Sequence, residues 1–300
     1  MNSVKDIKYV LITPARNEDE YIGKTIEAVI AQTIKPEKWV IVSDGSTDKT
    51  DEIAESYAKK IDFICFVKTK DQPDRNFGSK VAAFNLGLEQ LTNLEYDFIG
   101  NLDADISFDP DYYEKVLQRF QQNEKLGIAG GVRVDIVNGK PLKIRSSKNS
   151  VAGGFQFFRK KCFEDIGGYK KLDYGGIDAV AEISARMHGW QVESFSDIVA
   201  EHNKPTGSAV GNILKQKFRA GVKYYLLGYP PLFPFMRFGL RLKQKPVIIG
   251  SLISILGYYW ALVFRYKRPV PADFVRYLRE EQKKRIKNML AGKKDPAFRT

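Results

Sequence analysis

Two aspartates separated by one residue follow an apolar run, in the segment Asp103-Ala104-Asp105. In an extended chain, residues i and i+2 point to the same side, so both carboxylates would face one ligand. Carboxylates bind hard divalent cations, and such a cation can hold a diphosphate and neutralise its charge as it departs. A solvated loop or a helix cap uses the same residue types, so the pair alone leaves these alternatives open.

A second polar cluster, at residues 43–48, stands between a run typical of a strand and a run typical of a helix. Within it, Asp44 could accept hydrogen bonds from the N–H groups of a nucleobase, and Gly45 permits a tight turn. Ser46 and Thr47 are also typical of a helix N-cap. We expect both uses, because the capping residues need not be the binding residues.

Three single residues carry further potential chemistry. Lys80, at the start of another expected helix, could pair with a phosphate, although a lone lysine is more often a solvated surface residue. Asp178, at a helix start behind two glycines, could deprotonate a hydroxyl, but residue chemistry alone favours a helix N-cap. His202 suits Mn²⁺ better than Mg²⁺, and a hydrogen-bonded surface histidine is an equal alternative.

The elements that must position these residues alternate between strand-like and helix-like segments. Short apolar runs predict strands at 9–13, 39–43, 62–67, 96–102, 128–137, 151–158 and 191–200. Helical spacing predicts helices at 20–31, 47–60, 80–91, 110–122 and 178–188. This rhythm predicts an α/β fold with a mostly parallel central sheet covered by helices. Ligands bind beyond the carboxyl ends of such strands, which is where the polar clusters at 14–18, 44–46 and 103–105 stand.

The net charge of +12 is unevenly distributed over the 300 residues. Residues 204–300 hold 21 Lys and Arg against 4 Asp and Glu, giving +17, whereas the remaining 203 residues hold 27 against 32, giving −5. This asymmetry indicates that the basic part meets an anionic surface, either lipid or nucleic acid. Two cysteines are too few for a disulfide framework, and we expect no secretory signal and a cytosol-facing protein.

The order of the polar clusters resembles that of the family-2 inverting glycosyltransferases with the GT-A fold. Together the matching segments span about residues 8–205, and the set is specific although each piece alone is not. The matching segments are Thr13-Pro14-Ala15-Arg16-Asn17-Glu18, Val42 to Asp48, Lys80 to Asn85, Leu102-Asp103-Ala104-Asp105, Ile166-Gly167-Gly168-Tyr169, Gly176-Ile177-Asp178 and Arg186-Met187-His188-Gly189-Trp190. Residues 224–234 also look like a stretch of bacterial surface-polysaccharide glycosyltransferases.

The resemblance implies a role for each candidate residue. The nucleotide-sugar donor, a UDP-, GDP- or dTDP-sugar, would be held by Pro14, Ala15, Asn17, Glu18, Asp44, Lys80, Asp103 and Ala104. Mn²⁺ or Mg²⁺ would be bound by Asp103, Asp105 and His202. Asp178 matches the family's catalytic base, which would deprotonate an acceptor hydroxyl for an in-line displacement that inverts the anomeric configuration. Ile177 stands where the family commonly has a glutamate, and this departure puts the type of acceptor in doubt.

The basic C-terminal part predicts membrane association. Residues 247–264 lack charge, and as a helix they would reach roughly 27 Å, just short of a bilayer core. A spanning, an interfacial and a buried core helix remain open, and basic residues on both flanks favour interfacial attachment. Residues 233–242 predict a helix with a basic stripe on an apolar body, which would lie in the membrane plane. Gly250, Ser254, Gly257 and Ala261 form a stripe suited to close helix packing.

These observations predict a GT-A catalytic domain at 1–205 and a basic amphipathic helical region at 206–300. The expected location is the cytoplasmic face of the cell membrane, peripheral or monotopic, with a lipid-linked saccharide as acceptor. Nucleic acid is not an expected partner, because the basic residues alternate with long apolar runs and no nucleic-acid motif is present. The alternative functions are a non-catalytic nucleotide-sugar-binding membrane protein and, more weakly, a nucleotidyltransferase, which would need a glycine-rich basic loop near the N-terminus.

Overall fold

The computed structural model describes residues 4–69, 77–137, 139–144, 147–204, 213–235 and 248–291. The chain forms two compact units. Of the described residues, the first unit, here called the sheet unit, comprises 4–69, 77–137, 139–144, 147–171 and 177–204. The second, the helical unit, comprises 172–176, 213–235 and 248–291. The roles expected for the two parts of the chain stay predictions.

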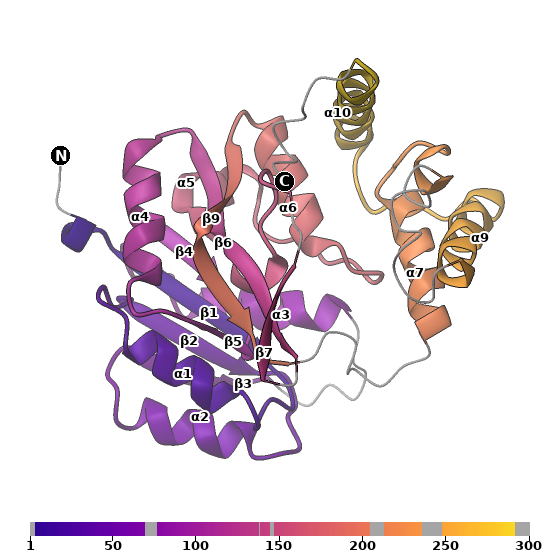
Figure 1. Cartoon of the computed structure of the whole chain (residues 1–300). Helices are drawn as coiled ribbons and strands as arrows, with labels where there is room; N and C mark the ends of the chain where they lie inside the picture. The colour runs from indigo at the N-terminus through magenta and orange to yellow at the C-terminus, as the bar shows by residue number, and fades with distance from the viewer. Residues whose placement is uncertain are drawn as a thin grey trace. The chain divides into compact units, whose positions relative to one another are not determined.

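The sheet unit is built on nine strands (Figure 1). They are β1 (Tyr9–Ala15), β2 (Lys38–Ser43), β3 (Ile64–Lys68), β4 (Phe98–Asn101), β5 (Ile106–Phe108), β6 (Leu126–Val137), β7 (Lys140–Lys143), β8 (Phe157–Arg159) and β9 (Gln191–His202). Their order is β3-β2-β1-β4-β8-β6-β9-β5, with β7 paired to β6. The first four strands in this order are parallel, as predicted, and β6 is parallel to β9, whereas β5, β7 and β8 pair antiparallel.

The inner strands of the parallel part, β1, β2 and β4, are buried because they are apolar along most of their length, as parallel strands covered on both faces must be. Tyr9 to Thr13 in β1 and Trp39 to Val42 in β2 are fully buried. The one polar side chain in this stretch of β1, Thr13, accepts a hydrogen bond from the indole N–H of Trp39 at 2.9 Å. Because β1, β2 and β4 are parallel, their carboxyl ends meet at one edge of the sheet.

In the described part of the sheet unit the helices are α1 (Ile22–Ile30), α2 (Thr50–Ala58), α3 (Phe77–Glu89), α4 (Tyr112–Gln122), α5 (Lys160–Asp165) and α6 (Ile177–Met187). Figure 1 shows α1 and α2 next to each other along one side of the sheet. The predicted strand at 151–158 is wrong for most of its length: a 3₁₀ turn covers Gly153–Phe155, and only the short β8 follows. Adjacent glycines weaken a strand, and the backbone there bonds to the loop after β4 instead.

The helical unit contains α7 (Ile213–Leu226), α9 (Ile249–Val263) and α10 (Ala272–Leu290). α7 and α9 pack closely because glycines face backbone: a Cβ on Gly221 would lie 1.9 Å from the carbonyl oxygen of Ser254, and one on Gly257 would lie 2.2 Å from that of Phe218. This confirms the predicted packing role of the small-residue stripe. An aromatic cluster that includes Tyr258 forms the core of this unit.

Among the described residues, no helix combines the length and the apolar character needed to cross a bilayer. The amphipathic helix predicted at 233–242 lies mostly outside the described residues, which end at 235 in this segment.

Candidate active site

The loops after β1 and β2 are joined to each other by side-chain to backbone hydrogen bonds. Asn17 has a φ of 54°, a left-handed conformation that asparagine tolerates better than most residues. This conformation lets its side-chain oxygen accept the backbone N–H of Thr47 at 2.8 Å. The backbone N–H of Glu18 donates to the Thr50 hydroxyl at 2.7 Å. The two loops therefore form one rigid floor at the carboxyl edge of the sheet.

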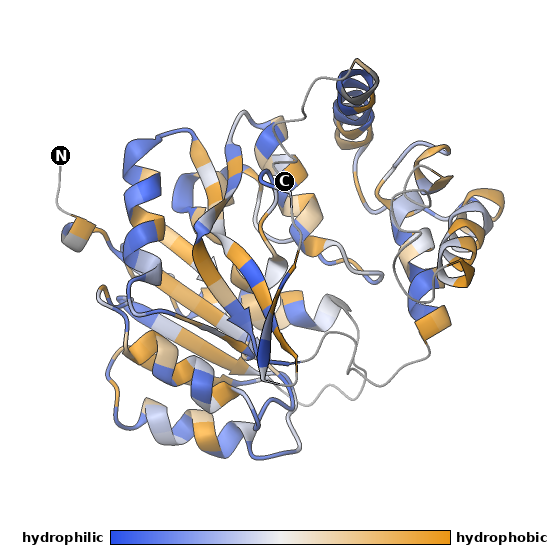
Figure 2. Cartoon of the chain, viewed as in Figure 1, coloured by the Kyte–Doolittle hydropathy of each residue, from blue (hydrophilic) through white to orange (hydrophobic). Residues whose placement is uncertain are grey.

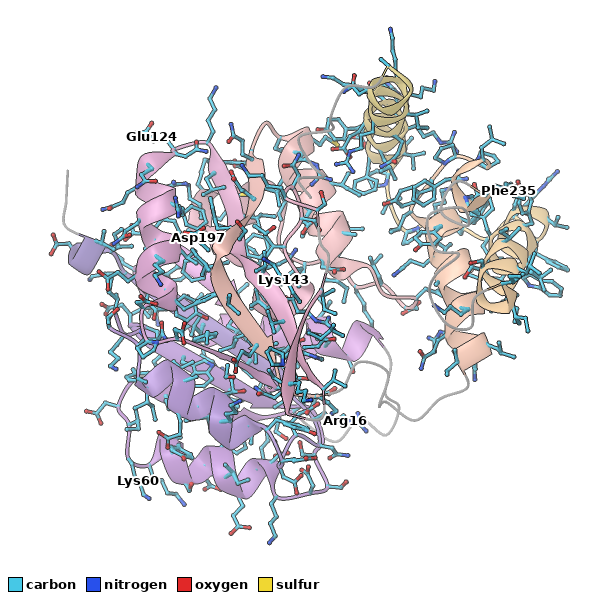
Figure 3. The ribbon with its side chains drawn as sticks, in the orientation of Figure 1. Arg16, Lys60, Glu124, Lys143, Asp197 and Phe235 are labelled. Carbon is cyan, nitrogen blue, oxygen red and sulfur yellow. The ribbon has the colours of Figure 1, made fainter. Side chains whose placement is uncertain are left out.

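Asp44 lies on this floor and is almost fully buried. Its backbone N–H donates to the Ala15 carbonyl at 2.8 Å, which continues the β1–β2 pairing beyond the strands. One guanidinium nitrogen of Arg16 lies 3.9 Å from the Asp44 carboxylate. Figure 3 labels Arg16 beyond the end of β1, at this edge of the sheet. A buried carboxylate with a cation beside it is well suited to accept hydrogen bonds from a ligand.

Asp103, two residues after the end of β4, is held by three groups. Lys80 on α3 donates to its carboxylate at 2.5 Å, and the Asn101 side-chain amide lies 3.4 Å from the same oxygen. Its backbone N–H donates to the Gly154 carbonyl at 2.7 Å. Burial opposes the charged ammonium of Lys80, but the attraction of Asp103, helped by two more distant aspartates, outweighs it and raises the pKa of Lys80. Lys80 is therefore a firmly charged partner of Asp103.

Two consecutive glycines lie against the two carboxylates of greatest chemical interest. A Cβ on Gly154 would lie 3.1 Å from a carboxylate oxygen of Asp103. A Cβ on Gly153 would lie 3.1 Å from a carboxylate oxygen of Asp178 and 2.9 Å from its Cβ. The Gly153 carbonyl accepts the Asn101 side-chain N–H at 2.6 Å, which fixes the pair to β4. Asp178, in the first turn of α6, and Asp103 are thus brought to the same small site.

Asp105 points to a different neighbour, His202 at the end of β9. One oxygen of its carboxylate lies 3.3 Å from Nε2 of His202, and Nδ1 of His202 lies 3.4 Å from the carboxylate of Asp135. The other oxygen of Asp105 is buried and has no hydrogen-bond partner in the described part of the chain. Such an oxygen is costly unless it is satisfied, and a divalent cation would satisfy it.

The described residues contain no group of three His, Cys, Asp or Glu side chains close enough to hold a metal ion. Asp105 and His202 are adjacent, whereas the Asp103 carboxylate is occupied by Lys80. Binding of a cation through all three predicted ligands therefore stays a prediction. A cation held by Asp105 and His202 would take its remaining ligands from a donor diphosphate and water, as Mg²⁺ and Mn²⁺ commonly do.

Lys204 closes the site from the end of β9. Its ammonium contacts both carboxylate oxygens of Glu18, at 2.8 and 2.9 Å. Burial raises the pKa of Glu18, and the pairing with Lys204 opposes that shift only in part. The preceding Asn203 donates to the Asp105 carbonyl from its backbone at 2.9 Å and from its side chain at 3.1 Å. These bonds hold the end of β9 against the loops after β1 and β4.

A buried polar network lies behind Asp178. One carboxylate oxygen of Glu182, one turn further along α6, accepts the backbone N–H of Val151 at 2.7 Å, the Ser150 hydroxyl at 3.2 Å and the Gln156 side-chain N–H at 3.1 Å. Burial raises the pKa of Glu182 to about 7, which these hydrogen bonds only partly oppose. Glu182 therefore connects α6 to the loop that carries the two glycines.

A family model described as Glycosyl transferase family 2 matches residues 10–172, more than half of the chain. The chain belongs to glycosyltransferase family 2. The match confirms the predicted resemblance, and it contains all three polar clusters after β1, β2 and β4. Asp178 and His202 lie beyond the matched residues, so their assignment rests on their place in the site.

Similar curated proteins of the family include poly-β-1,6-N-acetyl-D-glucosamine synthases. The synthase of Staphylococcus aureus (strain COL) is 26% identical over 270 residues, covering 83% of this chain and 62% of the relative. That of Staphylococcus epidermidis (strain ATCC 35984) is 27% identical over 225 residues, covering 68% and 51%. The chain thus spans less than two thirds of the length of these relatives.

Two solved glycosyltransferase structures share the fold. The mannosyltransferase PcManGT from Pyrobaculum calidifontis, in complex with GDP-Man and Mn²⁺, has a TM-score of 0.56 at 14% identity, covering 94% of this chain and 80% of that one. S. aureus TarS 1–349, in complex with UDP-GlcNAc, has a TM-score of 0.55 at 15% identity, covering 91% and 80%. The likeness confirms the predicted α/β fold of the GT-A type, with C-terminal helices following it.

Not every predicted donor residue of this family-2 enzyme exposes its side chain to the site. Pro14 and Ala15 lie at the end of β1, and Ala15 is buried. Ala104 is also buried, and its carbonyl accepts the Thr25 hydroxyl at 2.8 Å. Asn17 and Glu18 are engaged by protein groups. The predicted donor roles stay predictions. Apart from Glu18, the residues named here can contribute to donor binding mainly through their backbone groups or their shape.

Several residues of the site are absent from the sequence prediction. They are Asn101, Gly153, Gly154, Gln156, Glu182, Asn203 and Lys204. The glycine pair was the one available signal, because adjacent glycines inside an apparent strand often mark a close approach of another group. The other residues act through contacts that are remote in sequence.

Replacing Gly153 by alanine is expected to lower the turnover number about 10- to 100-fold while leaving donor affinity nearly unchanged. The new methyl group would displace Asp178, and small displacements of a catalytic group have effects of about this size. Steady-state kinetics and donor titration measure both quantities. Gly23→Ala in α1 is the matched control, because no atom lies within 4 Å of its new Cβ. Equal kinetics for both variants would contradict the assigned contact.

Replacing Glu182 by glutamine is expected to remove a pH-dependent loss of stability. The pKa of Glu182 rises from 4.5 to about 7 in the folded protein, so folding favours the protonated carboxyl group. This stabilisation is fully present below pH 4.5 and is lost as the pH rises through about 7. Glutamine stays neutral and can still accept hydrogen bonds. Relative to wild type, the free energy of unfolding of the variant should therefore increase by up to about 3 kcal/mol across this window.

Urea unfolding at several pH values measures this difference. Arg186 and Asp178 are the charged groups that most affect Glu182, and both are unchanged in the variant. Glu124→Gln, at an exposed position, is the matched control and should show no such trend. A constant difference between wild type and Glu182→Gln at all pH values would contradict a raised pKa for Glu182.

Proposed function

We propose that this family-2 glycosyltransferase is a metal-dependent inverting enzyme, with Asp178 as the catalytic base. The observation that carries the proposal is the placement of Asp178 and Asp103 against two consecutive glycines. Asp103 is paired with Lys80, near the β1–β2 floor, and Asp178 stands at the start of α6. A donor bound beside Asp103 and an acceptor hydroxyl bound beside Asp178 would then meet next to the two glycines.

In this proposal Asp178 takes the proton of the acceptor hydroxyl, whose oxygen attacks the anomeric carbon opposite the diphosphate. Asp105 and His202 would hold Mn²⁺ or Mg²⁺, which when bound neutralises charge on the leaving group. Lys80 remains charged beside Asp103 and adds a positive group near the same site. The Mn²⁺ in the PcManGT complex supports a metal in a protein of the same fold.

The nucleoside of the donor is proposed to lie on the β1–β2 floor against Asp44. A carboxylate accepts hydrogen bonds, so it fits the N–H groups of uracil, thymine or guanine. The complexes of similar structures with GDP-Man and UDP-GlcNAc support donors of these types. We therefore propose a UDP-, GDP- or dTDP-sugar as the donor, in line with the relatives named as polysaccharide synthases.

The proposed acceptor is a hydroxyl of a lipid-linked saccharide, at the cytoplasmic face of the cell membrane. Its support is the charge of +17 on residues 204–300, together with the long apolar segments that interrupt the basic residues. A surface of this kind would bring the enzyme to a substrate that is confined to lipid. The proposal favours peripheral or monotopic attachment.

The test is turnover of purified full-length protein with Mn²⁺ and UDP-, GDP- and dTDP-sugars, with and without lipid-linked saccharides. We expect one nucleotide to be released and NMR of the product to reveal an inverted anomeric centre. Retention of configuration would exclude Asp178 as the base of a single displacement. Binding of donors without any release of nucleotide would favour the non-catalytic alternative instead.

A further inference from the structure

The helix α9 has two faces with unlike surroundings inside the helical unit. The face with the small residues packs against α7. The opposite face carries six exposed apolar side chains, here called the outer stripe: Ile249, Leu252, Leu256, Trp260, Val263 and Phe264. Between 45% and 72% of each of these side chains is exposed. Figure 2 shows α9 mostly in hydrophobic colours and α10 mostly in hydrophilic ones.

The outer stripe is a continuous feature of one helix face. From Ile249 to Val263 its members follow one another at intervals of three or four residues, the spacing that places side chains on the same side of a helix, and the C-cap residue Phe264 comes four residues after Trp260. α9 contains no charged residue, so no charged side chain of this helix stands beside the stripe. Exposed apolar surfaces of this extent mark contact sites.

Charged residues near one end of the stripe identify the kind of partner. α7 and α9 run antiparallel, because Gly221 lies against Ser254 and Phe218 against Gly257. The first turn of α7, with exposed Lys215, therefore lies toward the end of α9 that is followed by exposed Arg265 and Lys267. No acidic residue occurs in α7, in α9 or in residues 264–268. The apolar stripe thus ends in a group of cations, which fits a surface with anionic headgroups.

The length of α9 decides how such a surface would be met. Its 15 residues reach about 22 Å, well short of a hydrocarbon core of about 30 Å. A helix of this length with one apolar face free lies in the plane of the interface. Trp260 within the stripe fits this position, because tryptophan is enriched where hydrocarbon meets headgroups.

We propose that the outer stripe of α9 inserts into the boundary between headgroups and acyl chains of an anionic lipid surface, with Lys215, Arg265 and Lys267 at the headgroups. This assigns the membrane contact, which the proposed function places only in the C-terminal region, to one face of one helix. It rests on the proposed function for its purpose, but the contact can be measured without any sugar transfer.

The test compares full-length wild type with the double variant Leu256→Gln, Val263→Gln in sedimentation with vesicles. The vesicles contain phosphatidylcholine alone or with phosphatidylglycerol. We expect wild type to bind the anionic vesicles and the double variant to bind them at least about tenfold more weakly, since two apolar side chains no longer enter the lipid. Leu142→Gln on β7 is the matched control, because Leu142 is 55% exposed in the sheet unit, and it should bind as wild type does.

Tryptophan fluorescence supplies a second measurement. Of the three tryptophans, Trp39 is fully buried and Trp190 packs against the core of the sheet unit, so Trp260 is the one that can enter lipid. Anionic vesicles should shift the emission of wild type to shorter wavelength, and Trp260→Phe should abolish the shift while retaining vesicle binding. A shift that persists in Trp260→Phe would overturn the proposal.

Two further outcomes would also overturn it. If the wild-type protein does not sediment with anionic vesicles, a lipid contact is excluded. A dimer in light scattering that the double variant converts to a monomer, without vesicle binding, indicates that a second copy covers the stripe. If the wild-type protein binds vesicles through the stripe but transfers no sugar, the result contradicts the proposed function and leaves the lipid contact in place.

Discussion

Asp178→Asn is expected to lower the turnover number by about 10²- to 10⁴-fold, the range typical for loss of a general base. Asparagine keeps the shape of aspartate but cannot take a proton. Asp178 stands at the start of α6 against Gly153, whereas the groups proposed to bind the donor are the β1–β2 floor, Asp103 and Lys80. Donor affinity should therefore change by no more than about twofold.

Single-turnover kinetics and donor titration separate these two effects. Asp197→Asn is a matched control, because Asp197 is an exposed carboxylate on β9 that pairs with Arg119. The control should keep wild-type kinetics, and its position away from Arg16 is visible in Figure 3. If Asp178→Asn weakened donor binding as strongly as it slowed turnover, Asp178 would belong to the donor site and another group would have to be the base.

Asp105→Ala is expected to reduce metal-dependent donor affinity about 100-fold or more and to remove most of the activity. The Asp105 carboxylate has a buried oxygen without a partner in the described residues, and it lies beside His202. A bound cation contributes several kcal/mol to charge stabilisation, which corresponds to at least this factor. Alanine would also leave His202 without one of its two neighbouring carboxylates.

Isothermal titration of the nucleotide with Mn²⁺ and with a chelator measures the metal-dependent part of binding. Wild type should bind much more tightly with Mn²⁺, and Asp105→Ala should lose this difference. Asp62→Ala, which removes an exposed carboxylate, should retain it. A wild-type affinity that is equal with and without the metal would remove the basis for a cation at Asp105.

The parts of the site at the ends of β1, β2 and β4 follow from the sequence through one rule. Parallel strands end at a common edge, so polar clusters after each strand must meet there. Asp44 and Asp103 were found in this way. The rule applies because apolar runs such as residues 9–13 can hardly be anything but buried strands.

Other parts of the site depend on contacts that local patterns do not contain. Lys204 meets Glu18 across 186 positions of the sequence, and only the order of the strands brings them together. Glu182 lies on a helix face that is buried against a loop, although glutamate is mostly exposed in proteins. The sequence predicts a strand over this loop because residues 151–158 form a short apolar run.

The adjacent glycines set the spacing between Asp103, on the proposed donor side, and Asp178, on the proposed acceptor side. Consecutive Cα atoms are about 3.8 Å apart in any trans peptide. Because Asp103 and Asp178 each lie against one of two consecutive residues, their separation is tied to a peptide unit rather than to flexible side chains. An engineer who wished to admit a bulkier acceptor would therefore gain little from trimming neighbouring side chains, and would have to rebuild the backbone at residues 153 and 154.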